Sequence, residues 1–519
     1  MEKFACFGQK LALFCKYSCR NLSCFNQFCQ RLIWLLFRFV VVHVNPVWIQ
    51  LCYLIVVSLV GYLALKLSKV RTTSFGPQDL DVFFTSVSAT TVSSMSTVEM
   101  QRGSGFPKTS IKGTDNRESA CRTIFESKIE LGLATRPQLE QGRLEIEKLE
   151  TNVENGVKSS NNDALRCHSI RSLTYVVLGY LLIIHVVGSG VVYLYISLVP
   201  SASQALNSRG LEIQTFSVFT VVSSFTNCGF IPTNENMMVF KKNSGLLLLL
   251  MPQILMGNTL YPPCLLLVIW VLKKITKRAE FAFMLRNYRD MGYRHLLSGT
   301  HAVLLAATVF GFTLIQFILF CSMEWNSEAM EGLSLYQKLV GSLFQTVNSR
   351  HAGESVFDLS NLSPAILVLF VVMMYLPPYT AFLPIKKAAC EVSETGKAGC
   401  RHRTRIPFNI ECLMLSQLSY LTICIILICI TERHKMKDDS LNFNVLNITL
   451  EVISAYGNVG FSTGYSCERQ LKLESSCTDT WYGFAGRWSI QGKLILIFVM
   501  FFGRLKEFNM KGGKPWKLS

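Results

Sequence analysis

The sequence predicts an all-α protein that crosses a membrane several times. Half of its 519 residues are hydrophobic and 16% are charged, whereas an ordinary soluble protein has about 25% charged residues. The apolar residues are gathered into runs, and most runs reach the roughly 18 residues that a helix needs to cross a bilayer about 30 Å thick. This composition excludes a disordered chain, a collagen-like repeat and a small disulfide scaffold.

Seven apolar runs are the expected membrane-spanning helices of this polytopic protein. They are Val47–Leu65, Leu173–Val199, Gly245–Leu272, Ala302–Met323, Ala365–Ile385, Leu413–Ile430 and Leu494–Phe502. The last run is short, and we expect its helix to continue through Gly503 and Leu505.

The basic residues set the expected orientation. Lys and Arg outnumber Asp and Glu by 51 to 34, which gives a net charge of +17. In a membrane protein such an excess collects in cytoplasmic loops, so we expect no nucleic-acid partner. Clusters follow three of the runs, at Lys273, Lys274, Lys277 and Arg278, at Lys386, Lys387, Arg401, Arg403 and Arg405, and at Lys506, Lys511 and Lys514. They place these loops and the N-terminus in the cytoplasm.

Four further segments are too short to span a membrane and too apolar to be ordinary loops. They are Asp81–Met100, Leu211–Met238, Leu335–Phe357 and Leu446–Tyr465. Irregular backbone at membrane depth is tolerated only where protein buries it or where it lines a water-filled cavity. These segments are therefore predicted to be re-entrant pore loops.

The four segments form a repeat that is anchored on Ser94, Gly229, Gly353 and Gly460, called here the filter positions. Ten residues before each filter position stands an apolar residue, and small residues follow it in most of the segments. A short pore helix that leads into an extended strand needs this pattern, because glycine permits backbone angles that other residues resist. One such glycine would be a turn glycine, but three at equivalent places in a repeat favour a filter.

The repeat predicts four units of span, pore loop and span around one pseudo-fourfold central pore. Backbone carbonyls of the four strands would replace the hydration shell of a cation. The expected organisation is a cytoplasmic N-terminal segment (1–46), unit one (47–100), a polar segment (101–171), unit two (172–278), unit three (295–390), a basic cytoplasmic linker (391–412) and unit four (413–519). The residues expected to flank the filter positions are Thr91, Val92, Ser93, Thr226, Asn227, Cys228, His351, Ala352, Asn458 and Val459.

The segments SVSATTVSSMSTVEM, SSFTNCGFIPTNENM, FQTVNSRHAGE and SAYGNVGFSTGYSC, with the ending FFGRLKEFNMKGGKPWKL, resemble the plant high-affinity potassium transporter (HKT) family. That family is similar to the bacterial Trk and Ktr cation transporters. The resemblance covers most of the chain from about Asn45 onward. It implies a multi-pass plasma-membrane cation transporter with a cytoplasmic N-terminus, whose filter positions select the ion. It implies no cofactor, and its expected partners are sodium, membrane lipid and a second copy of the chain in a homodimer.

In the HKT family the first filter position separates two branches. Members with glycine there also carry potassium, whereas most sodium-selective members have serine, so Ser94 implies sodium transport. A serine costs about 1 kcal/mol or more at a backbone position suited to glycine, and it disturbs the symmetry of a carbonyl ring. Potassium transport and sodium–potassium symport stay open as alternatives. A membrane-embedded enzyme is not expected, because no span carries a cluster of His, Asp or Glu.

Some residues have an expected role of their own. Arg504, inside the last span, either sets an electrostatic barrier in the pore or reaches to the cytoplasmic surface. Arg350 and His351 are expected to brace the third loop by hydrogen-bonding carbonyls. Glu99, Glu235 and Glu354 are expected to attract cations at the mouth, and His185 is expected to be a hydrogen-bonded interior histidine. Pro252, Pro262 and Pro263 would break the exit helix of unit two, and the sequence leaves open whether Cys467 and Cys477 pair.

Unit one departs from the repeat. After Ser94 no apolar run follows, and Gln101–Arg171 is polar throughout. The exit helix of unit one is therefore missing, through a skipped exon, a faulty gene prediction or a real variation. The sequence thus also allows a non-conducting, truncated variant.

We expect this 519-residue chain to conduct weakly or not at all, and an apolar helix of about 20 residues inserted after Met100 to restore conduction. A pore loop without its exit helix would leave backbone polar groups facing lipid, at several kcal/mol each. Sodium current at matched surface expression compares the two forms. Full conduction by the shorter form would contradict the expectation.

Overall fold

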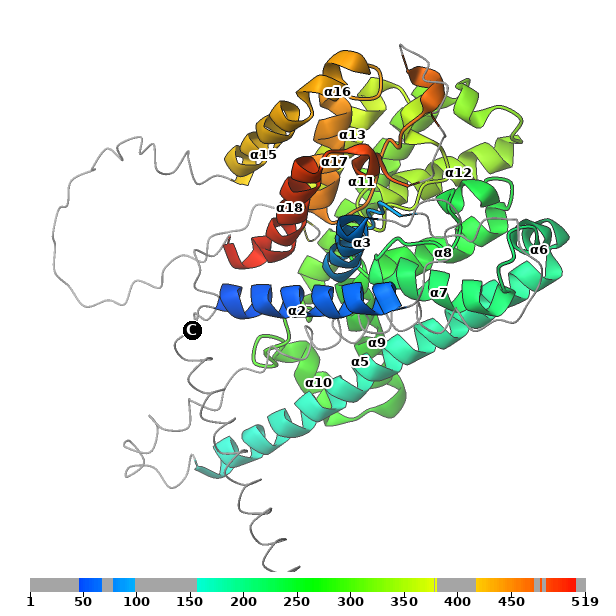
Figure 1. Ribbon diagram of the computed structural model, residues 1–519. Coiled ribbons are helices and arrows are strands. Elements are labelled where there is room, and N and C mark those ends of the chain that lie inside the picture. The colour runs from blue at the N-terminus through cyan, green and yellow to red at the C-terminus, as the bar shows by residue number, and fades with distance from the viewer. Residues whose placement is uncertain are drawn as a thin grey trace, which may run out of the picture. The chain divides into compact units, whose positions relative to one another are not determined.

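The structure is a computed structural model that describes residues 46–67, 78–98, 156–377, 379, 417–470, 477 and 482–509. The chain divides into two compact parts, Met1–Val56 with Leu505–Ser519 and Val57–Arg504. The second part contains all four pore-loop segments. The regular elements of the described residues are all helices, which confirms the all-α prediction (Figure 1).

Each of the seven apolar runs contains helix in its described residues, and parts of Ala365–Ile385 and Leu413–Ile430 lie outside those residues. The helices are α2 (Pro46–Leu67), α5 (Gly156–Leu198), the pair α8 (Ser244–Met256) and α9 (Tyr261–Thr276), α11 (Gly299–Glu324), α13 (Pro364–Tyr375), α15 (Gln417–Thr431) and α18 (Ile490–Asn509). Within the described residues, α2, α5 and α11 are long and apolar enough to cross a membrane, and the bent pair α8–α9 would make a fourth span. In the apolar 18-residue stretches of α2, α5 and α11, only 11% to 28% of the residues are buried inside the protein, as expected of helices that face lipid. The apolar helices α13 and α15 are shorter.

Each predicted pore loop begins with a short helix. These are α3 (Asp79–Thr91), α7 (Ile213–Thr226), α12 (Leu335–Asn348) and α17 (Val445–Gly457). At 13 or 14 residues and 1.5 Å per residue they measure about 20 Å, which is too short to cross a bilayer. Most of their side chains are buried, so protein surrounds them on most sides. The expected short helix is present in all four segments, and irregular backbone follows each helix.

The remaining helices are short connections. They are α6 (Pro200–Asn207), α10 (Ala279–Arg286), α16 (Arg433–Asp438) and the 3-10 turns η2 (Asn236–Phe240), η3 (Glu328–Met330), η4 (Leu359–Asn361), η5 (Cys467–Arg469) and η6 (Phe484–Arg487).

The first and exit helices of units three and four are joined in the same way. The Glu324 carboxylate at the end of α11 accepts the N–H of Ser363 at 2.8 Å, just before α13. The Glu432 carboxylate after α15 accepts the N–H of Ser489 at 2.8 Å, just before α18. Each carboxylate thus satisfies an amide at the positive end of an exit helix.

The exit helix of unit two is broken. The axes of α8 and α9 meet at 84° across a break of at most four residues. The break does not fall at Pro252, which lies inside α8, and the next proline, Pro262, lies in the first turn of α9, where a missing N–H costs no hydrogen bond. Gly257 allows the break to pack closely, because a Cβ there would collide with the Phe225 carbonyl.

Several sequence-based boundaries change or fall outside the described residues. Helix α5 begins at Gly156, so the end of the predicted polar segment 101–171 is helical. Its residues after Gly156 are polar, but none is a glycine or proline that would end a helix. The predicted loss of an exit helix after Met100 lies outside the described residues, as do most of the N-terminal segment and the linker 391–412.

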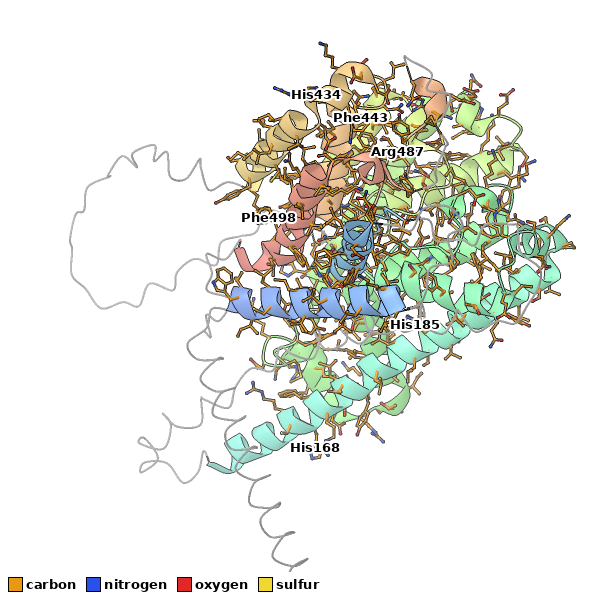
Figure 2. All side chains as sticks on the ribbon, in the orientation of Figure 1. His168, His185, His434, Phe443, Arg487 and Phe498 are labelled. Carbon is orange, nitrogen blue, oxygen red and sulfur yellow. A yellow bond between two sulfur atoms is a disulfide. The ribbon has the colours of Figure 1, made fainter. Side chains whose placement is uncertain are left out.

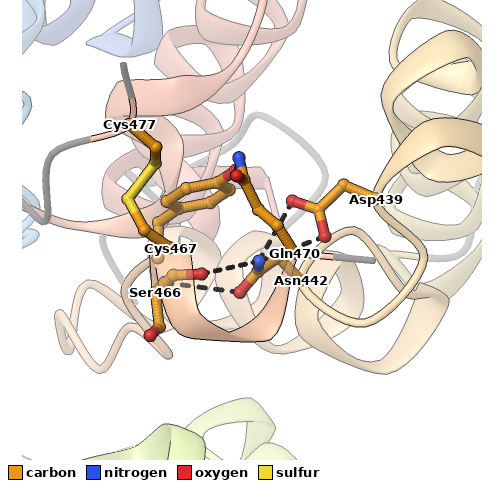
Figure 3. The surroundings of a disulfide bond; sticks show 7 residues. Asp439, Asn442, Ser466, Cys467, Gln470 and Cys477 are labelled. Carbon is orange, nitrogen blue, oxygen red and sulfur yellow. Dashed lines mark hydrogen bonds between the residues drawn. A yellow bond between two sulfur atoms is a disulfide. The ribbon is translucent and has the colours of Figure 1, made fainter. Parts of the chain in front are cut away.

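Cys467 and Cys477 form a disulfide with Cα atoms 6.0 Å apart, which answers the question left open by the sequence. Figure 3 shows that Asn442 holds the backbone beside it. The Asn442 amide donates to the Ser466 carbonyl at 2.9 Å and to the Asp439 carboxylate at 3.0 Å. This network fixes the strand that follows the fourth pore loop.

A buried ion pair joins unit one to unit four. Lys493, at the start of α18, lies 2.6 Å from Asp81 in the first turn of α3, and the two side chains are 7% and 14% exposed. Replacing Lys493→Met should lower the free energy of unfolding by about 3 kcal/mol, because it leaves the Asp81 carboxylate without its partner. Thermal unfolding of the purified protein in detergent measures the change.

The matched control is Lys66→Met. Lys66 pairs at 3.0 Å with Asp79, two residues from Asp81, but these side chains are 54% and 72% exposed. Water screens such a pair, so the unfolding temperature should not change. Equal losses in both variants would contradict a special role of the buried pair.

Candidate functional site

Three of the four pore helices end in the same backbone turn. The residue after each helix lies in the left-handed region, with φ of 61° at Val92, 55° at Asn227 and 53° at Asn458. The next N–H then donates back to a carbonyl of the helix, as in a Schellman motif. These bonds run from Ser93 to Ser88, from Cys228 to Ser223 and from Val459 to Ser454, at 2.8, 2.8 and 3.1 Å.

The third pore loop closes one residue later, where the N–H of Gly353 donates to the Asn348 carbonyl at 3.3 Å, and it adds a side-chain bond. His351, at the equivalent position, does not have a positive φ. The Val347 carbonyl, which corresponds to those of Ser88 and Ser223, accepts a hydrogen bond from Nδ1 of His351 at 2.5 Å. The side chain of Arg350 donates to the Pro377 carbonyl at 2.7 Å. Both side chains bind carbonyls, as the sequence predicted.

The four filter positions have left-handed backbone and face one another in a ring. Their φ angles are 58° at Ser94, 68° at Gly229, 67° at Gly353 and 105° at Gly460. A Cβ built on each glycine would meet the backbone of the next loop at the carbonyl that precedes its filter position. The neighbours are Ala352 for Gly229, Val459 for Gly353 and Ser93, at 2.9 Å, for Gly460. Ser94 closes the cycle, since its hydroxyl bonds to the Cys228 carbonyl.

Ser94 fills the space that the glycines leave. Its side chain would collide with a Cβ built on Gly460 and with a Cβ built on Gly229, in the second case through its Oγ. Its hydroxyl also donates to the Ala352 carbonyl at 3.0 Å. The described ring therefore holds one side chain and four converging carbonyl groups.

Polar side chains behind the ring hold the strands. The Ser88 hydroxyl accepts the N–H of Met95 at 2.7 Å, and the Ser454 hydroxyl accepts that of Gly460 at 3.0 Å. In the third loop Gln345 accepts the N–H of Val356 at 2.9 Å. Sequence reasoning missed Gln345 as a residue that holds the filter backbone, and the other polar residues of the same helix, such as Lys338 and Asn348, gave no pattern that would single it out.

Asn227 and Asn458 tie their pore loops to the exit helices of their own units. The Asn227 amide donates to the Ile254 carbonyl of α8 at 3.2 Å, and the Asn458 amide donates to the Met500 carbonyl of α18 at 3.3 Å. Asn458 also donates to the Ser93 hydroxyl at 2.8 Å. These two flanking residues thus position backbone, and their amides do not point into the ring.

The other flanking residues end their pore helices or fill the space behind the ring. Thr91 and Thr226 donate to carbonyls one turn earlier, both at 2.8 Å. Val92 and Cys228 are buried and pack together. Arg504 lies in the last turns of α18 and is half-buried, and its role as a barrier stays a prediction.

Two acidic residues expected at the mouth are not available there. Glu354 is completely buried and accepts the Ser224 hydroxyl at 2.6 Å. Glu235 forms an ion pair with Arg209 at 2.9 Å. The expectation was wrong for Glu354, because it follows the filter in sequence but turns back behind it in the fold. Glu99 lies outside the described residues.

His185 lies on α5 with no role in the ring (Figure 2). Its Nδ1 lies 2.7 Å from the Leu181 carbonyl one turn earlier, and its ring packs 4.7 Å from that of Phe225. This confirms the expectation of a hydrogen-bonded interior histidine.

Comparison with known proteins identifies the family. A family model described as TrkH, cation transport protein, matches residues 152–510. The chain is 50% identical over 475 residues to the sodium transporter HKT1 of Arabidopsis thaliana, an alignment that covers 88% of this chain and 92% of the relative. It is 46% identical over 535 residues to the cation transporter HKT1;3 of Oryza sativa, with 98% of each chain covered.

A solved structure shares the fold. The potassium transporter TrkH from Vibrio parahaemolyticus has a TM-score of 0.51 at 14% identity, over 90% of this chain and 84% of the other. The family match includes three of the four ring positions, Gly229, Gly353 and Gly460, and the two plant relatives extend over most of the chain. The chain therefore belongs to the plant HKT cation transporters, within the TrkH family of cation transport proteins.

Proposed function

We propose that this transporter moves sodium through the ring of filter positions in preference to potassium. The observation that carries the proposal is the Ser94 side chain inside the ring, where its hydroxyl bonds to the Cys228 and Ala352 carbonyls. The Arabidopsis relative, which is named a sodium transporter, supports it. Plasma-membrane location, a cytoplasmic N-terminus and a homodimer belong to the same proposal.

The mechanism follows from competition for carbonyl oxygens. An ion that sheds its water needs the four converging carbonyls as substitute ligands. The Ser94 hydroxyl lies within hydrogen-bond distance of two of them and its single proton is shared between them, so an ion at this level meets an incomplete ring. Potassium, the larger ion, loses more from an incomplete ring, whereas sodium can pass with part of its water and with the hydroxyl oxygen as a ligand. Arg504 would add a positive barrier further along the path.

Potassium transport, sodium–potassium symport and a non-conducting chain are the alternatives that the experiments below separate. Each experiment is carried out both on this chain and on the form with an apolar helix inserted after Met100.

Replacing Ser94→Gly should raise potassium permeability relative to sodium about fivefold or more, which corresponds to the ~1 kcal/mol of a typical hydrogen bond. The replacement removes the hydrogen bond that the Cys228 and Ala352 carbonyls share, and it removes the one Cβ among the four filter positions. Reversal potentials of voltage-clamped oocytes in sodium and potassium baths measure the ratio. Ser93→Gly is the control, because the Ser93 hydroxyl contacts Thr91 and Asn458, both at 2.8 Å, and lies outside the ring. A reversal potential of the unaltered transporter that follows potassium would refute sodium selectivity.

Replacing Gly460→Ala should abolish current, and adding Ser94→Gly should restore part of it. The Cβ on Gly460 collides chiefly with the Ser94 side chain, so removing that side chain relieves the collision. Gly229→Ala should also abolish current, but Ser94→Gly should not rescue it, because the new Cβ still collides with the Ala352 carbonyl. The measurement is the current of each single variant and of its double variant with Ser94→Gly, at matched surface expression. Equal rescue of both would show that the ring is wider than described.

A further inference from the structure

The second ring nitrogen of His351 reaches from the third pore loop to the exit helix of unit two. Nε2 lies 2.8 Å from Oγ1 of Thr259, and the two side chains are 3% and 0% exposed. Because the Val347 carbonyl can only accept, Nδ1 carries the proton in that bond. In the neutral ring Nε2 then accepts from the Thr259 hydroxyl. One imidazole thus joins the end of α12 to α8–α9.

Thr259 lies at the break between α8 and α9. Its neighbour Asn258 donates to the Asn227 side chain in the second pore loop at 3.2 Å. Two adjacent residues of the break therefore hold two different pore loops. Gly257, just before them, lies against the Phe225 carbonyl so closely that no Cβ fits. Because the helix bends sharply here, Asn258 reaches the second pore loop while Thr259 reaches the third. A straight helix would not bring adjacent residues to both loops.

His351 is next to Ala352, whose carbonyl belongs to the ring. The planar peptide unit between the two residues would pass a shift of the His351 backbone on to Ala352, and Ala352 is completely buried, so its carbonyl would be displaced with it. We propose that Thr259 and His351 are positioning residues that hold the third carbonyl of the ring against the bend of α8–α9, so that ion preference depends on a hydroxyl outside the pore loops. This inference rests on the proposed function of the ring.

Four replacements separate the two bonds of His351. Thr259→Val removes the hydroxyl and keeps the branched shape, whereas Thr259→Ser keeps the hydroxyl. His351→Asn places its amide near Nδ1, so it keeps the bond to Val347 and loses Thr259. In His351→Gln the longer amide side chain can reach Thr259, but it loses the hydrogen bond to the Val347 carbonyl.

Thr313→Val is the matched control. Thr313 lines the same small cavity as Thr259 and His351. Its hydroxyl donates to the Val309 carbonyl of its own helix at 2.9 Å and has no bond to a pore loop. Removing the Thr313 hydroxyl changes the polarity of the cavity but leaves the hydrogen bond between Thr259 and His351 in place.

We expect Thr259→Val and His351→Asn each to shift the potassium-to-sodium permeability ratio about two- to tenfold, the range of a single hydrogen bond. The double variant should shift it no further, because both remove the same bond. Thr259→Ser and Thr313→Val should match the unaltered transporter. The ratio comes from reversal potentials. A second measurement, the rise in unfolding temperature of the purified protein in sodium relative to potassium, needs no current.

The outcomes separate this inference from the proposed function. If the unaltered protein shows cation-selective current or cation-dependent stabilisation, and Thr259→Val behaves identically, this inference is overturned and the proposed function stands. Equal shifts in Thr313→Val, or additive shifts in the double variant, overturn it as well. If the unaltered protein shows neither current nor cation-dependent stabilisation, the proposed function fails and the inference fails with it.

Discussion

The ring of filter positions has room for one Cβ atom, and the rest of the site depends on this steric limit. Each filter position has left-handed backbone, and a Cβ added to any of the three glycines would meet the carbonyl of the next loop. Three positions must therefore be glycine, and the fourth can carry a side chain only because the other three do not. Since Ser94 also bonds to carbonyls of units two and three, this single residue affects more than its own loop.

Non-repetitive backbone at membrane depth requires a partner for each buried N–H and C=O. The four units meet this demand by different means. Units one, two and four close their pore helices with a left-handed backbone turn, whereas unit three closes one residue later and adds a bond from the His351 imidazole. Behind the strands, serine hydroxyls serve units one and four, and the Gln345 amide serves unit three. The loops follow similar paths with different chemistry, so one chain builds a ring whose sides are not equivalent.

Among the described residues, the first pore loop is in contact with unit four and with α2. Asn227 and Asn458 bind exit helices of their own units, but the equivalent residue of unit one is Val92, which cannot form such a bond. The contacts across to unit four join Ser93 to Asn458, Ser96 to Gly483 and Asp81 to Lys493. The Ser86 hydroxyl also bonds to the Ser58 carbonyl of α2 at 2.7 Å. Within the described residues, the first pore loop is therefore positioned by α2 and by unit four.

The sequence by itself determined the helices, the pore loops and the filter positions, because these depend on local properties. Hydropathy over one span decides a membrane helix, and a glycine repeated at one place marks a backbone that rejects side chains. The tertiary structure alone decided which side chains meet. His351 and Thr259 are 92 residues apart, and Ser224 and Glu354 are 130 apart. Such pairs form only when the bend of α8–α9 and the packing of four pore helices bring them together, and no local pattern records that geometry.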